Sequence, residues 1–110
     1  MESPLHSSPQ LDKLVALDKV IHERVRLGIM AALSVSQELT FQEIKQMLKV
    51  TDGNLSVHLR SLEKHDYVEA EKNFIGRKPQ SCYRLSATGR SAFRKYISQM
   101  ENLICDLHLD

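Results

Sequence analysis

Apolar residues recur at helical spacing near both ends of the chain. The first run starts at Leu11, and its spacing predicts a helix over 11–19 and a second helix over 22–35. Because no glycine or proline separates these two helices, one long bent helix is the alternative. The last run follows Ser86, a good residue for the position before a helix, and repeats by fours and threes up to Leu107.

Between these runs the pattern predicts two shorter helices joined by a tight turn. Thr40 and Glu43 have the spacing of a capping box, which satisfies free backbone amides at the start of a helix. Thr51 is the predicted cap of the next helix, which extends over 51–65. Its buried stripe is expected to consist of Leu55, Leu59 and Leu62.

After residue 66 the period changes from helical spacing to alternation. Residues 67–74 and 82–85 are predicted strands, and 75–79 (Ile-Gly-Arg-Lys-Pro) is predicted as the hairpin tip between them. The whole order predicts a mainly α fold with a small β-hairpin. It is the order of a winged helix-turn-helix, with additional helices at both ends.

The overall composition narrows the class of protein. A length of 110 residues suits one domain, which we expect over 10–110 after a flexible arm over 1–9. The chain has no signal-peptide pattern, no run long enough to span a membrane and no CxxC pair, so we expect a cytoplasmic protein. Because the net charge is only +1, any surface for nucleic acid must come from the placement of its charges.

The outer face of the helix over 51–65 carries groups that can read bases in a major groove. Arginine can bind guanine, asparagine can bind adenine, and a small apolar group can touch the thymine methyl. In the hairpin, Lys72, Arg77, Lys78 and Arg84 occur with no acidic residue between them, although a hairpin made soluble by cations is the ordinary alternative. We predict DNA contacts at Thr51, Gly53, Asn54, Ser56, Val57, His58, Arg60, Ser61, Lys64, Lys72, Arg77 and Lys78.

Two other functions compete with DNA binding. A winged-helix module that binds only proteins would carry apolar residues on the outer helix face, where Val57 is the only one. An enzyme would need a nucleophile or an acid–base set, and none of the usual catalytic motifs occurs. Cys105 and His108 could share one face, but a structural zinc site needs four ligands, so the others would have to come from another subunit. We therefore predict a protein that is not an enzyme and has no metal or cofactor.

The terminal helices carry more apolar surface than the small core can cover. One recognition helix reads only a few base pairs, whereas two copies spaced by ~34 Å can read a palindrome. The alternative is that these helices pack only on their own domain. We predict a homodimer that pairs through Leu11, Leu14, Val15, Phe93, Ile97, Met100, Ile104 and Leu107.

Several segments together resemble one family. They are residues 21–27, 39–41, 51–59, 76–79, 83–86 and 88–90. On these residues the chain resembles the small winged helix-turn-helix transcriptional regulators of bacteria and archaea related to the MarR and ArsR types, over about 18–96. The resemblance implies a homodimer that binds specific duplex DNA, with the helix over 51–64 in the major groove and the loop around Arg77 and Lys78 as the wing.

One departure from this family bears on the inducer. The thiol pair of ArsR-type metal sensors is missing, because residues 55–62 contain no cysteine. We therefore do not expect a metal inducer bound at this helix. A repressor acting on a palindromic operator is the predicted role, and a small-molecule effector bound at the dimer interface is a further prediction whose identity the sequence does not name.

Overall fold

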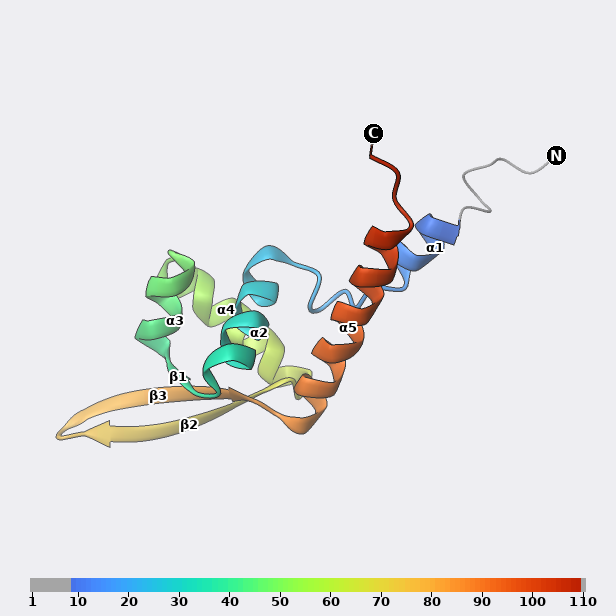
Figure 1. Cartoon of the computed structure of the whole chain (residues 1–110). Coiled ribbons are helices and arrows are strands. Elements are labelled where there is room, and N and C mark those ends of the chain that lie inside the picture. Colours follow the sequence, from blue (N-terminus) through green and yellow to red (C-terminus); the bar gives the residue numbers. More distant parts are fainter. Residues whose placement is uncertain (1–8, 110) are drawn as a thin grey trace.

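Five helices and three strands make up residues 9–109, the part of the chain that the structure, a computed structural model, describes. Helices α2, α3 and α4 gather in the middle, the β2–β3 hairpin projects to one side, and α5 with α1 projects to the other (Figure 1). The predicted class, mainly α in the order of a winged helix-turn-helix, is confirmed. The elements are α1 (Pro9–Val15), α2 (Arg24–Ser36), β1 (Leu39–Thr40), α3 (Phe41–Leu48), α4 (Asp52–Lys64), β2 (Val68–Ile75), β3 (Lys78–Leu85) and α5 (Ala87–Cys105).

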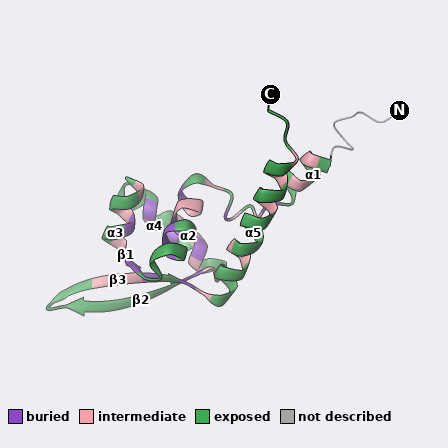
Figure 2. Cartoon of the chain, viewed as in Figure 1, coloured by how far each residue is buried: buried purple, intermediate pink, exposed green. Residues whose placement is uncertain are grey.

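The core forms where α2 packs against α3, α4 and the inner end of the sheet. The buried residues concentrate there, while the hairpin and the far part of α5 are largely exposed (Figure 2). As predicted, Leu55, Leu59 and Leu62 all face the core, and none is more than 1% exposed. Helical spacing therefore determines which face of α4 is left for solvent.

The sheet has the strand order β1-β3-β2 and is antiparallel. Its hairpin turns at two residues, Gly76 and Arg77, and Gly76 has a φ of 64°, which glycine adopts without strain. Strand β1 was not predicted; its two residues pair with Tyr83 and Cys82 of β3. This third strand fixes the inner half of β3, so the hairpin is anchored at its base and free at its tip.

Three predicted helix caps are present. Thr40 and Glu43 form the predicted capping box at the start of α3. The Thr51 hydroxyl accepts from the Asn54 amide at 3.2 Å, and the Ser86 hydroxyl accepts from the Gly89 amide at 2.8 Å. Each contact satisfies an amide that the helix itself leaves unpaired.

The boundaries near the N-terminus differ from the prediction. Helix α1 ends at Val15, not at residue 19, and a turn follows in which the Asp18 carboxylate accepts from the amides of Val20 and Ile21 at 2.8 and 3.1 Å. Helix α2 begins at Arg24, not at residue 22, because the Glu23 carboxylate caps it. The single long bent helix is therefore wrong. Of the predicted arm, residues 1–8 lie outside the described residues, and Pro9 already begins α1.

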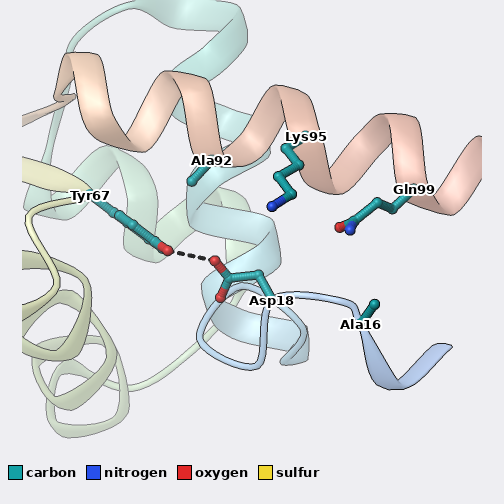
Figure 3. A pocket seen from close by; sticks show the side chains of 6 residues that line it. All are labelled: Ala16, Asp18, Tyr67, Ala92, Lys95 and Gln99. Carbon is teal, nitrogen blue, oxygen red and sulfur yellow. Dashed lines mark hydrogen bonds between the residues drawn. The ribbon is translucent and has the colours of Figure 1, made fainter. Parts of the chain in front are cut away.

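Two hydrogen bonds tie the linker between α1 and α2 to the rest of the fold. The Tyr67 hydroxyl donates to the Asp18 carboxylate at 2.5 Å (Figure 3). Burial and this carboxylate raise the pKa of Tyr67 to about 12, so the hydroxyl keeps its proton at neutral pH. His22 is exposed and pairs through Nδ1 with the Tyr96 hydroxyl at 2.7 Å. The linker thereby joins α5 to the start of α2.

The close packing around Gly89 in the first turn of α5 predicts that one added methyl group destabilises the fold. A Cβ at Gly89 would overlap the carbonyl oxygen of Tyr67, a backbone atom that already accepts from the Ser86 amide at 3.1 Å. We expect Gly89→Ala to lower the free energy of unfolding, measured in urea, by about 1–3 kcal/mol.

Gly53→Ala is the matched control. No atom among the described residues lies within 4 Å of a Cβ added there, and Gly53 is within α4. Its free energy of unfolding should stay the same or rise by up to ~1 kcal/mol. Equal losses in both variants would contradict this account of the α5 start.

Candidate nucleic-acid interface

Helix α4 leaves the face opposite its leucines open to solvent. Of the predicted DNA-contacting residues on this helix and its cap, Ser56, His58 and Ser61 are half-buried, and the others are exposed: Thr51, Gly53, Asn54, Val57, Arg60 and Lys64. The exposed set holds the three types of group that distinguish bases in a major groove: a guanidinium, a carboxamide and a small apolar side chain. The geometry therefore leaves these groups accessible, and their contacts with DNA stay a prediction.

A salt bridge joins the start of α4 to α3. Lys45 Nζ lies 2.8 Å from Asp52 Oδ1; Asp52 is exposed and Lys45 is half-buried. Asp52 suits the positive end of the helix dipole, but a free carboxylate there would repel phosphates. Lys45 offsets that charge. The sequence pattern did not predict this pair, because it forms only across the turn between the two helices.

His58 is held by α2 instead of standing free. Its Nδ1 lies 3.0 Å from Arg26 Nη1 and 3.6 Å from Glu23 Oε1, and its side chain is only 18% exposed. Because a guanidinium only donates, Nδ1 accepts from Arg26 when the ring is neutral with its proton on Nε2, and it faces the Glu23 carboxylate when the ring is protonated. The predicted contact of His58 with phosphate is therefore restricted to Nε2, and the residue also fastens α4 to the start of α2.

Glu23 is at the centre of this junction. Its Oε1 accepts from the amides of Val25 and Arg26 at 2.9 and 2.8 Å. Burial raises the pKa of Glu23, but the Arg26 amide, His58 and the Val25 amide together lower it below the ordinary 4.5. Glu23 and Arg26 fall within the segment 21–27 that carried the family resemblance, but sequence reasoning gave them no role. A carboxylate just before a helical run is the signal that indicates such a cap.

The cations of the hairpin fall into two groups. Lys72, Arg77 and Lys78 are exposed, and the ion pairs among residues 9–109 do not include them. Arg84, in contrast, is paired with two carboxylates of β2: its Nε is 3.1 Å from Glu69 and its Nη1 is 3.2 Å from Glu71. These contacts raise the pKa of Arg84.

The predicted positive charge of the whole hairpin therefore needs correction. No acidic residue lies between Lys72 and Arg84 in the sequence, but the strand register brings Glu69 and Glu71 beside Arg84. The base of the hairpin, with one arginine against two glutamates, therefore contributes no net positive charge. Its unpaired positive charge is confined to the outer half, at Lys72 and the tip.

The predicted dimer surface divides into two groups. Phe93 and Met100 are half-buried and pack against the core of their own domain. The other six residues are between 39% and 73% exposed. Five of them lie on α1 and α5, which project together from the body, and Leu107 follows the end of α5 (Figure 2). An ion pair between Lys13 and Asp106 holds α1 against the end of α5. The exposed six are Leu11, Leu14, Val15, Ile97, Ile104 and Leu107.

Other kinds of site receive no support from residues 9–109. Within that part of the chain, no three side chains of His, Cys, Asp or Glu converge as metal ligands do. None of its helices is long and apolar enough to cross a bilayer. Cys82 is half-buried, and burial together with Glu38 and Glu71 raises the pKa of its thiol, whereas Cys105 is exposed.

Comparison with known proteins points to the same fold and kind of protein. A family described as a winged helix DNA-binding domain matches residues 25–104. An uncharacterized protein of Methanocaldococcus jannaschii is 34% identical over 85 residues, which are 77% of this chain and 92% of that protein. The family match includes nearly all of α2, then α3, α4, the hairpin and nearly all of α5.

Solved structures agree with this match. A transcriptional regulator homologue from Pyrococcus horikoshii OT3 is 27% identical, with a TM-score of 0.82 over 93% of this chain and 100% of that one. A transcriptional regulator of the MarR family from Enterococcus faecalis V583 has a TM-score of 0.68 at 23% identity, over 91% and 89% of the two chains, and shows likeness of fold. The resemblance to winged helix-turn-helix regulators that the sequence motifs indicated is confirmed by the family match and by the Pyrococcus horikoshii structure.

The environment of Glu23 predicts a dependence of stability on pH. A carboxyl whose pKa is lowered by folding stabilises the protein above its unfolded pKa, near 4.5, and this gain is lost as pH falls through the folded value. The free energy of unfolding of Glu23→Gln should therefore lie below that of the wild type at neutral pH. The difference should shrink once the pH falls below about 4.5.

Urea unfolding between neutral and acid pH measures this difference. Glu101→Gln, which removes one exposed carboxylate from α5, controls for the loss of a negative charge alone. A gap between wild type and Glu23→Gln that stays constant at every pH would contradict the assigned role of Glu23.

Proposed function

Because the chain belongs to the winged helix DNA-binding domain family and is a DNA-binding transcriptional regulator, we propose that it acts as a homodimeric repressor of specific promoters. In this proposal α4 enters the major groove of duplex DNA, and the β2–β3 hairpin contacts the backbone or the minor groove beside it. Occupation of the operator then blocks transcription from the promoter.

The exposed outer face of α4 is the observation that carries this proposal. The buried leucines hold the helix by one side, and Asn54, Arg60 and Lys64 remain accessible on its outer part. A module that binds only proteins needs an apolar outer face, and Val57, 59% exposed, is the only large apolar residue exposed on α4. The balance of groups therefore favours a charged, hydrogen-bonding partner such as DNA.

Dimerisation is proposed from the apolar residues on the projecting helices. Val15 and Ile104 are 73% and 59% exposed, which is unusual for large aliphatic side chains on two adjacent helices. Pairing α1 and α5 with those of a second copy would bury them. The two α4 helices would then address a palindromic operator.

A hollow beside α5 is a candidate space for the predicted small-molecule effector. It has a volume of about 280 Å³, and its walls come from α5, the linker between α1 and α2, and Tyr67 (Figure 3). An occupant there would contact the Asp18–Tyr67 hydrogen bond, which connects the projecting helices with the body. The lining residues are Ala16, Asp18, Tyr67, Ala92, Lys95 and Gln99.

Selection of duplexes from a random pool with the purified protein tests DNA binding and dimerisation together. We expect enrichment of a palindrome whose half-sites are centred ~34 Å apart, or one turn of the double helix. Failure to enrich any sequence at moderate salt would contradict the proposal and leave the protein-interaction alternative. A single enriched half-site would contradict the dimer alone.

The proposed division between helix and hairpin predicts two different losses. Replacing both Arg77 and Lys78 with Ala should weaken binding to all sequences alike and reduce the slope of log K against log salt by about 1 per charge removed. Arg60→Ala should instead relax preference at one or two base positions, at a cost of about 1–3 kcal/mol on the selected sequence.

Titrations of a selected and a scrambled duplex at several salt concentrations separate these effects. All three residues are exposed, so the variants should fold, and Arg94→Ala on α5 controls for the loss of an exposed cation. Equal losses from both changes on both duplexes would contradict this division of labour.

A further inference from the structure

The tip of the hairpin is amphiphilic. Phe74 is 71% exposed and Ile75 is 64% exposed, although both are large apolar residues. They lie at the end of the molecule opposite α1 and α5, so the proposed dimer does not cover them (Figure 1). Two adjacent apolar side chains exposed at a projecting tip indicate a surface that binds a partner, because binding would bury them.

The strand register surrounds these side chains with cations. Phe74 pairs with Pro79 and Ile75 with Lys78, and the turn between them consists of Gly76 and Arg77. Neighbouring residues of a strand point to opposite faces, so each face of the tip carries one large apolar group. Lys72 shares the face of Phe74, whereas Lys78 shares that of Ile75. Apolar and cationic groups therefore alternate within a few residues.

Charge decides which partner suits this tip. Arg84 is already neutralised by Glu69 and Glu71, so the free cations of the hairpin gather next to Phe74 and Ile75. A polyanion that also offers flat apolar surface satisfies both features. Duplex DNA has phosphates along its edge and base faces within its stack, and apolar wedges from proteins enter between base steps from the minor groove.

We propose that Phe74 is a wedge that enters a base step from the minor groove and kinks the duplex there. The inference rests on the proposed function and deepens it. Arg77 and Lys78 bind the phosphates on either side of the opened step, and Ile75 packs against the sugars. Because Gly76 adds no side chain to the turn, the tip can approach the floor of the groove.

The wedge adds a source of specificity that the contacts of α4 do not supply. Pyrimidine–purine steps unstack at lower cost than other steps, so the hairpin selects for them without a hydrogen bond to any base. Selected sequences should therefore show TA or CA/TG steps beside the palindromic core.

A tryptophan at the tip tests the insertion directly. The chain contains no tryptophan, so Phe74→Trp introduces a single reporter at an exposed site. Its emission should be quenched by stacking when the protein binds the duplex enriched in the pool selection. Val35→Trp, at the 83% exposed position near the end of α2, is the control and should keep its emission.

Phe74→Ala tests the contribution to binding. Because stacking of one base on an aromatic ring is worth about one order of magnitude in affinity, we expect about tenfold weaker binding to that duplex, with the salt slope unchanged. Energy transfer between dyes at the two duplex ends should report a loss of the kink, which wedges of this kind set at ~20° or more. Val35→Ala should change neither quantity.

The outcomes separate this inference from the proposed function. Tight binding by Phe74→Ala with an unchanged kink, or no quenching of Phe74→Trp on bound duplex, would overturn the wedge and leave DNA binding in place. A wild-type protein that binds no duplex would overturn both. Emission that shifts to the blue only with vesicles of phosphatidylglycerol and phosphatidylcholine would overturn the wedge and indicate a lipid surface.

Discussion

Burial of the leucine stripe of α4 is the constraint on which the rest of the structure depends. Leu55, Leu59 and Leu62 are sealed in the core by α2, so the helix has only one rotational setting in which its apolar side is out of water. In that setting Asn54 and Arg60 are exposed, because the leucines on the opposite face determine the rotation of the helix. The chemistry of the outer face is thus free to vary, because packing on the inner face determines its position.

Polar contacts then connect α4 to the parts that project from the body. Glu23 caps α2 and, with Arg26, borders His58 of α4, so the start of one helix and the middle of another share a junction. One residue before Glu23, His22 bonds to Tyr96 of α5. A displacement of α5 therefore has a continuous path of packed and hydrogen-bonded groups toward α4. These contacts connect α5 physically to α4; the free energy that couples a movement of α5 to one of α4 is a different quantity, which double-mutant cycles measure.

Local patterns predicted most of this fold, and contacts between distant residues account for what they missed. Helical spacing identified the buried face of α4, and single side chains identified the caps at Thr40, Thr51 and Ser86. Strand β1 was not predicted because two residues are too few to show a period. They form a strand only because they pair with β3. The early end of α1 depends on hydrogen bonds made by Asp18, which periodicity does not register. The same limit applies to the candidate interface. The exposed face of α4 and the exposed hairpin tip could be predicted from the sequence pattern. The ion pairs of Arg84 could not, because they depend on the strand register, and neither could the contact between His58 and Arg26, because it depends on how α2 packs against α4.

The carboxylates that pair with Arg84 have a second consequence, because β2 is an outer strand of the sheet. One side of this strand has backbone donors and acceptors with no neighbouring strand in residues 9–109, which is a template for the addition of another chain. Glu69, Glu71 and Lys72 lie along this strand. If a second copy paired with it, these charges would lose part of their hydration, which costs free energy. The charges along β2 therefore oppose the addition of a second copy of the chain to this edge of the sheet.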